Sequence, residues 1–386
     1  MKSPVGLVTA ALTAAILLTA TLVIATGTRG EETEFPSSAG GLEVRTFARG
    51  LVNPWSLAFL PDGRMLVTER PGRMRIVSAE GQLSPPLKGV PDVWASGQGG
   101  LLDVMTDKSY AQNRTIYFCF AERTSGGGRT AIARAKLNDG SGRLDETKII
   151  FRQEGPLTSG NHYGCRIVQA DDGNLFVTLG EHFVPRDLAQ DLGNHLGKVI
   201  RIAPDGSVPS GNPFIGRAGA KPEIWSYGHR NGQGLAINPA SGEVWETEHG
   251  PRGGDEVNII GKGKNYGWPV IGYGIDYSGS KIHESTAKAG MEQPVKYWVP
   301  SIAPSGMLFY TGKLFPKWSG SLFTGALAGT MLVRLSLNGN AVTGEERLLQ
   351  NLHERIRDVR QGPDGALWLL TDSSSGRILR VAPSSK

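Results

Sequence analysis

Two glycine-flanked segments carry side chains that could do acid–base chemistry. His162 lies in GNHYG (160–164), and Glu181 follows an apolar run in GEH (180–182). Imidazole titrates near neutral pH, and a neighbouring carboxylate can fix its tautomer and raise its basicity. His162 is therefore a candidate general base with Glu181 as its partner, although a single loop histidine is more commonly plain polar surface.

The segment 248–256 (EHGPRGGDE) combines glycine and proline with acidic side chains. Glycine and proline leave main-chain carbonyls free and fixed, which suits a hard cation such as Ca²⁺ that takes oxygen ligands. Asp255 and Glu256 could add carboxylates. The segment predicts a cation site, and a Gly/Pro hairpin with solvated charges is the alternative.

Three further polar clusters could contact a ligand. They are GQGGLL (97–102) with Gln98, GHRNGQG (228–234) with Arg230 and Asn231, and RIRD (355–358). Glycines in the first let the backbone approach a ligand closely, although a plain turn explains them as well. Side chains alternate along a strand, so Arg355 and Arg357 share a face and suit carboxylates or phosphates. A surface ion-pair ladder is the alternative for the two arginines.

The strands that must position these clusters repeat along the chain. Six similar apolar strands are found at residues 65–68, 116–120, 175–178, 244–247, 307–310 and 367–371. Most follow an Asp-Gly or Ser-Gly turn, at 62–63, 172–173, 241–242, 305–306 and 364–365. A more strictly alternating strand comes later in the unit, as at 198–202, 331–335 and 377–381.

Six such units predict an all-β fold, a six-bladed β-propeller with four-stranded antiparallel blades. The early strand at 42–47 could complete the last blade and close the ring. An irregular pair of β-sandwiches is the alternative architecture. Propellers carry function on loops at one mouth of the central channel, so the polar clusters above are expected to meet there.

The N-terminal region predicts export. Residues 3–28 carry no charge, follow Lys2, and are largely apolar. They form a signal peptide cleaved after Ala25 or an uncleaved anchor, which would be the chain's one contact with a membrane. Residues 29–41 are expected to be a flexible spacer and residues 42–386 the propeller domain. Export places the domain in the periplasm or outside the cell.

The charges bear on whether the protein binds nucleic acid, and the two cysteines bear on whether it contains a disulfide. The formal net charge of +5 comes from 41 basic and 36 acidic side chains spread along the chain, which does not indicate nucleic-acid binding. Cys119 and Cys165 could pair in an oxidising compartment. Each is also typical of a small buried residue on a strand, and we favour that interpretation.

In their order along the chain, these clusters resemble the pyrroloquinoline quinone (PQQ)-dependent soluble aldose sugar dehydrogenases of the glucose/sorbosone dehydrogenase family. The resemblance runs from about residue 42 to residue 384 and includes NYGWP (265–269). It implies oxidation of an aldose at C1 to a lactone, with hydride transfer to PQQ. The electron acceptor beyond PQQ is unknown and could be a quinone, a cytochrome or an artificial dye.

The resemblance also assigns roles to residues of this chain. His162 would be the general base and Glu181 would orient it. The cofactor and the sugar would be contacted by Gln98, His162, Arg230, Asn231, Arg355 and Arg357. Ca²⁺ would be held by the main-chain carbonyls of Gly250 and Pro251, and a further Ca²⁺ by Glu256 and the Tyr266 carbonyl.

Two positions depart from the family pattern. Ala328 stands where some members place a lysine toward the cofactor, which puts affinity for PQQ in doubt. Gly232 replaces a proline common after Arg-Asn, which should loosen that loop. Two other functions remain open: a calcium-dependent lactonase or other hydrolase with a central ion, and a non-catalytic propeller that binds a protein or a glycan.

Overall fold

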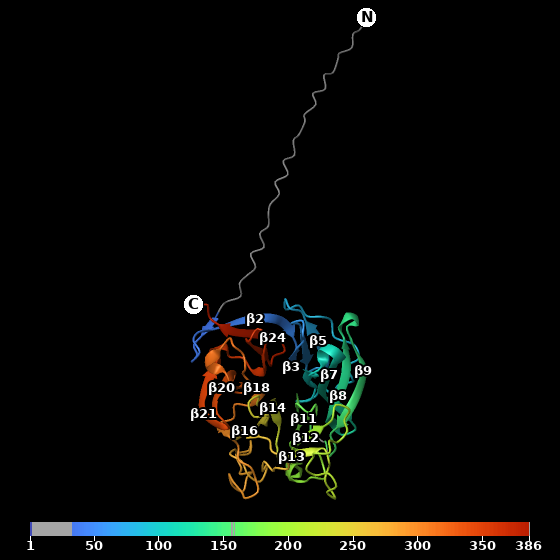
Figure 1. The fold of residues 1–386 in the computed structure, drawn as a ribbon, viewed down its shortest axis with the longest axis vertical. Coiled ribbons are helices and arrows are strands. Elements are labelled where there is room, and N and C mark those ends of the chain that lie inside the picture. Colours follow the sequence, from blue (N-terminus) through green and yellow to red (C-terminus); the bar gives the residue numbers. More distant parts are fainter. Residues whose placement is uncertain (2–32, 156, 158, 386) are drawn as a thin grey trace. The chain divides into compact units, whose positions relative to one another are not determined.

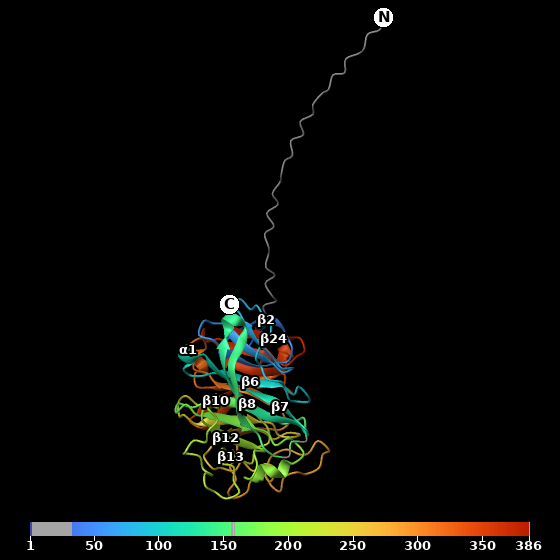
Figure 2. The ribbon, with the colours of Figure 1, turned by 90° about the vertical axis from the view of Figure 1, so that its right-hand side faces the viewer.

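The computed structural model describes Met1 and residues 33–155, 157 and 159–385. The predicted signal or anchor (1–28), apart from Met1, lies outside the described residues, as do spacer residues 29–32. No helix among the described residues is long and apolar enough to span a membrane. From Thr33 onward the chain forms a ring of six antiparallel β-sheets (Figures 1 and 2).

The first three blades follow the chain from residue 54 to residue 227. Their strands are β3 (Pro54–Phe59), β4 (Met65–Glu69) and β5 (Arg73–Val77); β6 (Leu101–Thr106), β7 (Thr115–Thr124), β8 (Gly127–Asn138) and β9 (Arg143–Arg152); and β10 (Gly164–Gln169), β11 (Leu175–Leu179), β12 (Lys198–Ile202) and β13 (Ile224–Tyr227). The short helix α1 (Tyr110–Asn113) joins β6 to β7. Blade 1 has three named strands, and a bridge between Val77 and Leu83 begins a fourth.

The other three blades complete the ring. Their strands are β14 (Gly232–Ile237), β15 (Val244–Glu248), β16 (Asp255–Ile259) and β17 (Lys296–Trp298); β18 (Pro304–Phe309), β19 (Leu322–Ala326), β20 (Met331–Asn338) and β21 (Ala341–Leu348); and β22 (Ile356–Gln361), β23 (Leu367–Thr371), β24 (Gly376–Pro383), β2 (Leu42–Leu51) and β1 (Thr33–Phe35). The predicted six-bladed propeller is confirmed, with one five-stranded blade.

The ring closes as the sequence predicts, because β2 pairs with β24 from Leu42↔Pro383 to Leu51↔Gly376. The two strands lie side by side in Figure 1, although they come from opposite ends of the chain. Strand β1 pairs with β2, and Phe35 is 4% exposed within the core. The innermost strand of each blade contacts the innermost strand of the next all around the ring.

The hydrophobic core is divided into six layers, one between each pair of neighbouring blades. Between blades 4 and 5, for example, Trp245 and Phe309 meet edge to face at 5.4 Å. Edge-to-face contacts between buried aromatic rings add to the free energy gained by burying their area. The core therefore packs each blade against its two neighbours.

One predicted repeat is wrong. Residues 307–310 were expected to match the second strand of the other blades, but they belong mainly to β18, the first strand of blade 5. All six residues of β18 are buried, so its composition imitates a second strand. The equivalent strand is β19, and the turn before it uses Gly320, whose φ is +77°. Gly306 lies within β18 and makes no such turn.

The expectation of unpaired cysteines is also wrong. Cys119 on β7 and Cys165 on β10 form a disulfide with a Cα–Cα distance of 5.7 Å. Both are fully buried on strands, as expected, but the strands belong to neighbouring blades and face each other across the layer between them. The bond joins blade 2 to the start of blade 3, three residues after His162.

Each innermost strand carries a β-bulge near its start. The register shifts lie at 54/56, 101/104, 164/167, 232/234, 304/307 and 356/358. A bulge adds a residue to one strand, bends it and re-aims the neighbouring side chains. All six bulges lie at the same edge of the ring, because every innermost strand begins there. This edge is the mouth at which the polar clusters were expected to meet.

Candidate active site

A pocket of about 370 Å³ opens at this mouth, and all six blades line it. We call it the central pocket. Its walls include Gln98 from blade 2, Asn231 from blade 4, and Arg355 and Arg357 from blade 6. Four of the predicted cofactor-contacting residues are thus brought together from distant parts of the chain.

The predicted base and its partner form a buried pair beside this pocket. Nδ1 of His162 lies 2.7 Å from Oε2 of Glu181, and both side chains are almost fully buried. Burial lowers the pKa of His162, and the nearby Arg230 lowers it further, although Glu181 opposes the shift. Burial would raise the pKa of Glu181, but His162, Arg230 and the Phe183 N–H together outweigh burial, and the pKa lies below its usual value. The pair is therefore a neutral imidazole on a carboxylate at neutral pH.

Backbone geometry fixes the position of His162. Its φ is +53°, in the left-handed region, just ahead of the bulge in β10. Its backbone N–H donates to Oε1 of Gln98 at 2.9 Å, which ties blade 3 to blade 2. The Phe183 ring packs edge-on against the imidazole at 5.3 Å. These contacts leave Nε2 as the nitrogen available to receive a proton, since Nδ1 is engaged by Glu181.

Arg355 and Arg357 reach the central pocket from the strand face that the sequence predicts. Both guanidiniums pair with Oδ2 of Asp372, at 2.8 Å for Arg355 and 3.5 Å for Arg357. Nη1 of Arg357 also donates to Oε1 of Gln233 at 3.0 Å. The two arginines thus form the ion pairs that the alternative interpretation predicts. These ion pairs line the central pocket and do not lie on the outer surface.

Arg230 does not line the central pocket, and it contacts the predicted cation site instead. Its Nη1 donates to the carbonyls of His249 at 2.9 Å and Gly250 at 2.8 Å. Its side chain is buried, and its guanidinium lies over the Trp268 ring at 5.1 Å. The neighbouring Asn231 accepts from the Gly164 N–H at 3.0 Å. Both residues therefore hold the turns around them, and Asn231 also lines the central pocket.

All four predicted metal ligands line one small cavity of about 20 Å³, next to Arg230. These are Gly250, Pro251, Glu256 and Tyr266. Burial raises the pKa of Glu256 to about 8, and the like charge of Glu248 adds to the shift. Asp255 lines no part of this cavity. Its carboxylate accepts from the N–H groups of Gly250 and Ile302 at 2.9 and 2.7 Å, which places it in a supporting role.

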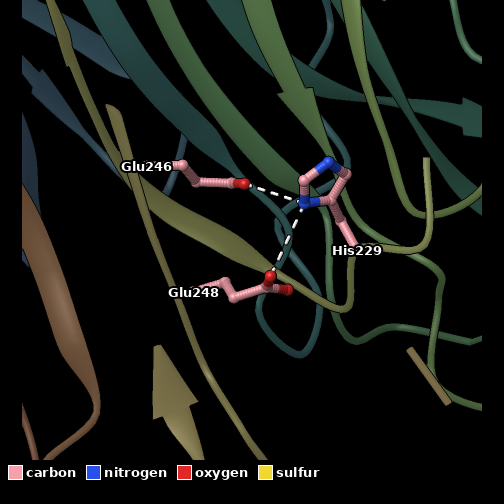
Figure 3. A group of neighbouring side chains, drawn as sticks. All are labelled: His229, Glu246 and Glu248. Atoms are coloured by element: carbon pink, nitrogen blue, oxygen red, sulfur yellow. Dashed lines mark ion pairs between the residues drawn. The ribbon is translucent and has the colours of Figure 1, made fainter. Parts of the chain in front are cut away.

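His229, the residue before Arg230 in the chain, belongs to a buried histidine–carboxylate cluster (Figure 3). Nδ1 of His229 is 2.9 Å from Oε2 of Glu246 and 3.5 Å from Oε1 of Glu248. Burial disfavours the charge on His229, but the two carboxylates outweigh it and raise the pKa of His229 to about 10. Glu248 also accepts from the Arg230 backbone N–H at 2.6 Å. The cluster therefore fixes the backbone that carries Arg230.

Several residues of the site were missed in the sequence. Arg70 lines the central pocket and donates to the Gly97 carbonyl at 2.6 Å. It directly follows β4, so the rule that function follows the apolar strands could have found it. Glu246 and Glu248 alternate on one face of β15, which the strand period indicates. Nothing in the sequence indicated that His229 meets them.

The two departures from the family pattern have different structural contexts. Ala328 is exposed and is not part of the central pocket lining, whereas its neighbour Leu327 is. Gly232 does not loosen a loop, because it begins β14. A Cβ at this position would lie 1.9 Å from Oε1 of Glu246. Glycine at 232 therefore makes room for the buried glutamate.

Comparisons with known proteins agree with this arrangement. The aldose sugar dehydrogenase YliI of Escherichia coli (strain K12) is 50% identical over 346 residues, which cover 89% of this chain and 93% of that protein. The crystal structure of the soluble aldose sugar dehydrogenase from Escherichia coli in the apo-form has a TM-score of 0.87 at 48% identity, with 89% and 100% of the two chains covered.

A cofactor-bound structure is also similar. The PQQ-bound form of aldose sugar dehydrogenase from Streptomyces coelicolor has a TM-score of 0.74 at 32% identity, with 88% of this chain and 98% of that chain covered. The family model for glucose / sorbosone dehydrogenase matches residues 51–380, nearly the whole propeller. The chain therefore belongs to the glucose/sorbosone dehydrogenase family.

Proposed function

We propose that the protein oxidises aldose sugars at C1 to lactones, with PQQ and Ca²⁺ as cofactors and His162 as the general base. The observation that carries the proposal is the His162–Glu181 pair, buried at 2.7 Å beside an arginine-lined pocket. The similarity to aldose sugar dehydrogenases, one of them bound to PQQ, supports the same reaction.

The central pocket fits the proposed organic cofactor. PQQ carries three carboxylates, and the pocket presents the guanidiniums of Arg70, Arg355 and Arg357. Planar guanidiniums bind carboxylates through paired hydrogen bonds. Nε of Arg357 is buried and has no hydrogen-bond partner among the described residues, so a donor is available to an added anion. Trp55, also in the wall, is almost fully buried, and the guanidiniums of Arg166 and Arg357 lie over its ring at 4.1 and 5.6 Å.

The Gly250–Pro251 turn fits the proposed calcium ion. Its carbonyls belong to the hard oxygen donors that Ca²⁺ takes, and Asp255 holds the turn through the Gly250 N–H. The Gly250 carbonyl accepts from Arg230, and a carbonyl oxygen has a second lone pair for a cation. When bound, PQQ with Ca²⁺ would accept the hydride, and the ion would polarise the acceptor.

The protein's own residues would hold the sugar and move the proton. Nε2 of His162 would take the proton of the anomeric hydroxyl, because Nδ1 is held by Glu181. The Glu181 carboxylate would stabilise the imidazolium that forms. Arg230 would stabilise negative charge at the reacting end of the pocket, with Asn231 beside it. Gln98 is exposed, and its Oε1 accepts a hydrogen bond from the backbone N–H of His162. Its side chain would contact the sugar.

Other parts of the proposal concern the protein's surroundings. Glu256 and the Tyr266 carbonyl would hold a further Ca²⁺ in the small cavity behind Gly250. Electrons would pass to an acceptor that could be a quinone, a cytochrome or a dye. The apolar N-terminal segment would direct the chain to the periplasm or outside the cell, where the Cys119–Cys165 disulfide would persist.

The carboxylates of the central channel do not favour the hydrolase alternative. A central ion would need carboxylates or amides from several blades. Asp103 of blade 2 and Asp358 of blade 6 lie there, but Arg166 and Arg360 engage both of them. Among the described residues, the one His/Cys/Asp/Glu group with metal-site spacing belongs to blade 4 alone.

Reconstitution tests the proposal. The apo protein is loaded with PQQ and Ca²⁺, and dye reduction is followed with a panel of aldoses. Sugar-dependent reduction is expected, and His162→Ala should retain PQQ binding while losing most turnover. Absence of reduction by any aldose, with cofactor binding demonstrated, would overturn the dehydrogenase proposal. Turnover that survives in His162→Ala would overturn the assignment of the base.

A further inference from the structure

Blade 4 buries a histidine between two carboxylates that have no direct part in the proposed reaction. Nδ1 of His229 lies 2.9 Å from Oε2 of Glu246 and 3.5 Å from Oε1 of Glu248. Figure 3 shows both carboxylates pointing toward this one ring nitrogen, and the three ligand atoms all lie within 4.8 Å of one another. The three side chains are at most 5% exposed, so bulk water is not their partner.

Hydrogen bonds do not account for these polar atoms. Nδ1 of His229 and both carboxylate oxygens of Glu246 are buried and have no hydrogen-bond partner among the described residues. The 2.9 Å contact is therefore an ion pair in which the ring N–H does not point at the carboxylate. Buried polar atoms are nearly always hydrogen-bonded, so three such atoms in one place call for another partner. A cation bound between the side chains would be that partner.

The charges and the donor types match a transition-metal dication. An imidazolium between two carboxylates leaves one buried negative charge uncompensated, whereas a dication in place of the Nδ1 proton makes the group neutral. Zn²⁺ binds imidazole nitrogen and carboxylate oxygen at about 2.0–2.2 Å, so neighbouring ligand atoms of a tetrahedral site lie about 3.3 Å apart. The separations of 2.9 and 3.5 Å lie on either side of that value. Ca²⁺ takes oxygen ligands, so the nitrogen distinguishes this group from the proposed calcium sites.

Neighbouring polar groups hold the three side chains in the orientation that metal binding needs. Oγ of Ser226 lies 2.8 Å from Nε2 of His229, which leaves Nδ1 as the nitrogen for a metal. Oε1 of Glu248 accepts from Nδ2 of Asn258 at 3.0 Å and keeps a second lone pair. Histidines that bind metals usually have a hydrogen-bond partner on the other ring nitrogen, and the ligating carboxylates are hydrogen-bonded in turn.

We infer that His229, Glu246 and Glu248 form a structural site for a divalent transition metal, and that Zn²⁺ is the ion this donor set favours. His229 and Glu246 line no part of the small cavity in which the further Ca²⁺ is proposed, so the two sites are separate. Glu248 also accepts from the backbone N–H of Arg230, so the ion would fix that stretch of backbone. Because the ligands are buried, the metal would enter as the chain folds. The inference does not depend on PQQ or on the sugar.

Metal content tests the site. The full chain is expressed in medium supplemented with Zn²⁺, desalted in the presence of EDTA to remove loosely held ions, and analysed by inductively coupled plasma mass spectrometry. About one zinc ion per chain is expected, and X-ray absorption at the zinc edge should show nitrogen and oxygen neighbours at about 2.0–2.2 Å and no sulfur. A zinc content near zero, or a zinc ion without a nitrogen neighbour, would overturn the site.

Substitutions locate the ion within blade 4. His229→Gln and Glu246→Gln should each lower bound zinc by at least about tenfold, since loss of an outer partner alone costs about 10–100-fold in metal affinity. Glu256→Gln is the matched control, because it removes a buried carboxylate of the same blade that lines the small cavity, and it should keep the zinc. Zinc that survives both of the first two substitutions, or that is lost in Glu256→Gln, would overturn the assignment.

A milder variant decides the question if the ligand variants do not fold. Ser226→Ala leaves the three ligands in place and removes only the partner of Nε2. It should weaken zinc binding about tenfold or more in competition with a chelator. An unchanged affinity in Ser226→Ala would mean that His229 is not a ligand.

Discussion

Replacing Glu181 by glutamine removes a charge from the base pair and keeps its shape. Glu181 accepts from His162 at 2.7 Å inside the protein, so its charge favours the imidazolium that forms during proton transfer. Two unit charges about 4 Å apart, at an effective dielectric constant of about 20, interact by about 4 kcal/mol. If the imidazole carries about half a charge in the transition state, the loss is about 2 kcal/mol, or about thirtyfold in rate.

The pH dependence gives an independent signature. His162 must be neutral to accept a proton, so kcat/KM rises as the pH rises through its pKa and then levels off. Glu181 opposes the lowering of that pKa by burial. Without its charge the pKa falls further, so the rising limb moves to lower pH while the plateau drops about thirtyfold.

The assay is dye reduction with glucose across pH 4 to 9 in enzyme loaded with PQQ and Ca²⁺. The control is Glu223→Gln, because Glu223 pairs with His195 at 3.3 Å in the same blade and lines no part of the central pocket. Glu223→Gln should retain both the plateau value of kcat/KM and the pH at which the rising limb lies. A Glu181→Gln plateau within threefold of the unmodified enzyme would refute the reasoning. If the plateau value of kcat/KM falls while the rising limb stays at the same pH, Glu181 only supports the local structure.

Three further perturbations follow from the structure. Arg70→Ala should weaken PQQ binding about fivefold in a fluorescence titration, since it removes one partly exposed cation, and unchanged affinity would exclude Arg70 from the site. Gly232→Ala should cost about 1–3 kcal/mol in urea unfolding, because the new Cβ meets the Glu246 carboxylate, and the cost should shrink in a Glu246→Ala background. Cys119→Ser should lose about 2–4 kcal/mol of unfolding free energy relative to the oxidised protein, and a reductant should abolish the difference if the bond to Cys165 is its cause.

The fold was predictable because its signals are local and repeated. A short apolar strand, in most blades preceded by an Asp-Gly or Ser-Gly turn, identifies a blade, and six such strands indicate the ring. The signal failed in blade 5, where β18 is buried along its whole length and therefore resembles a second strand. Composition reports how deeply a strand is buried, and it does not report which strand of the blade it is.

The site was predictable only in part, because its contacts cross between blades. His162 and Glu181 both belong to blade 3 and carry glycine-rich surroundings that single them out. The disulfide joins strands of different blades, and spacing along the chain does not tell which strands face each other.

The six bulges have a consequence for how such a protein can change. Each separates a stretch of mouth backbone from the regular ladder below it, so the hydrogen bonds of the sheet do not depend on which side chain stands at the mouth. The ladder within each blade is thereby independent of the mouth side chains, whereas Gln98 and Asn231 still tie neighbouring blades together at the mouth. One blade can exchange a base for an arginine while its five neighbours keep their register. Each of the six blade ends can therefore carry different side chains at the mouth without a change in the sheet below it. A single scaffold can in this way acquire different reactions.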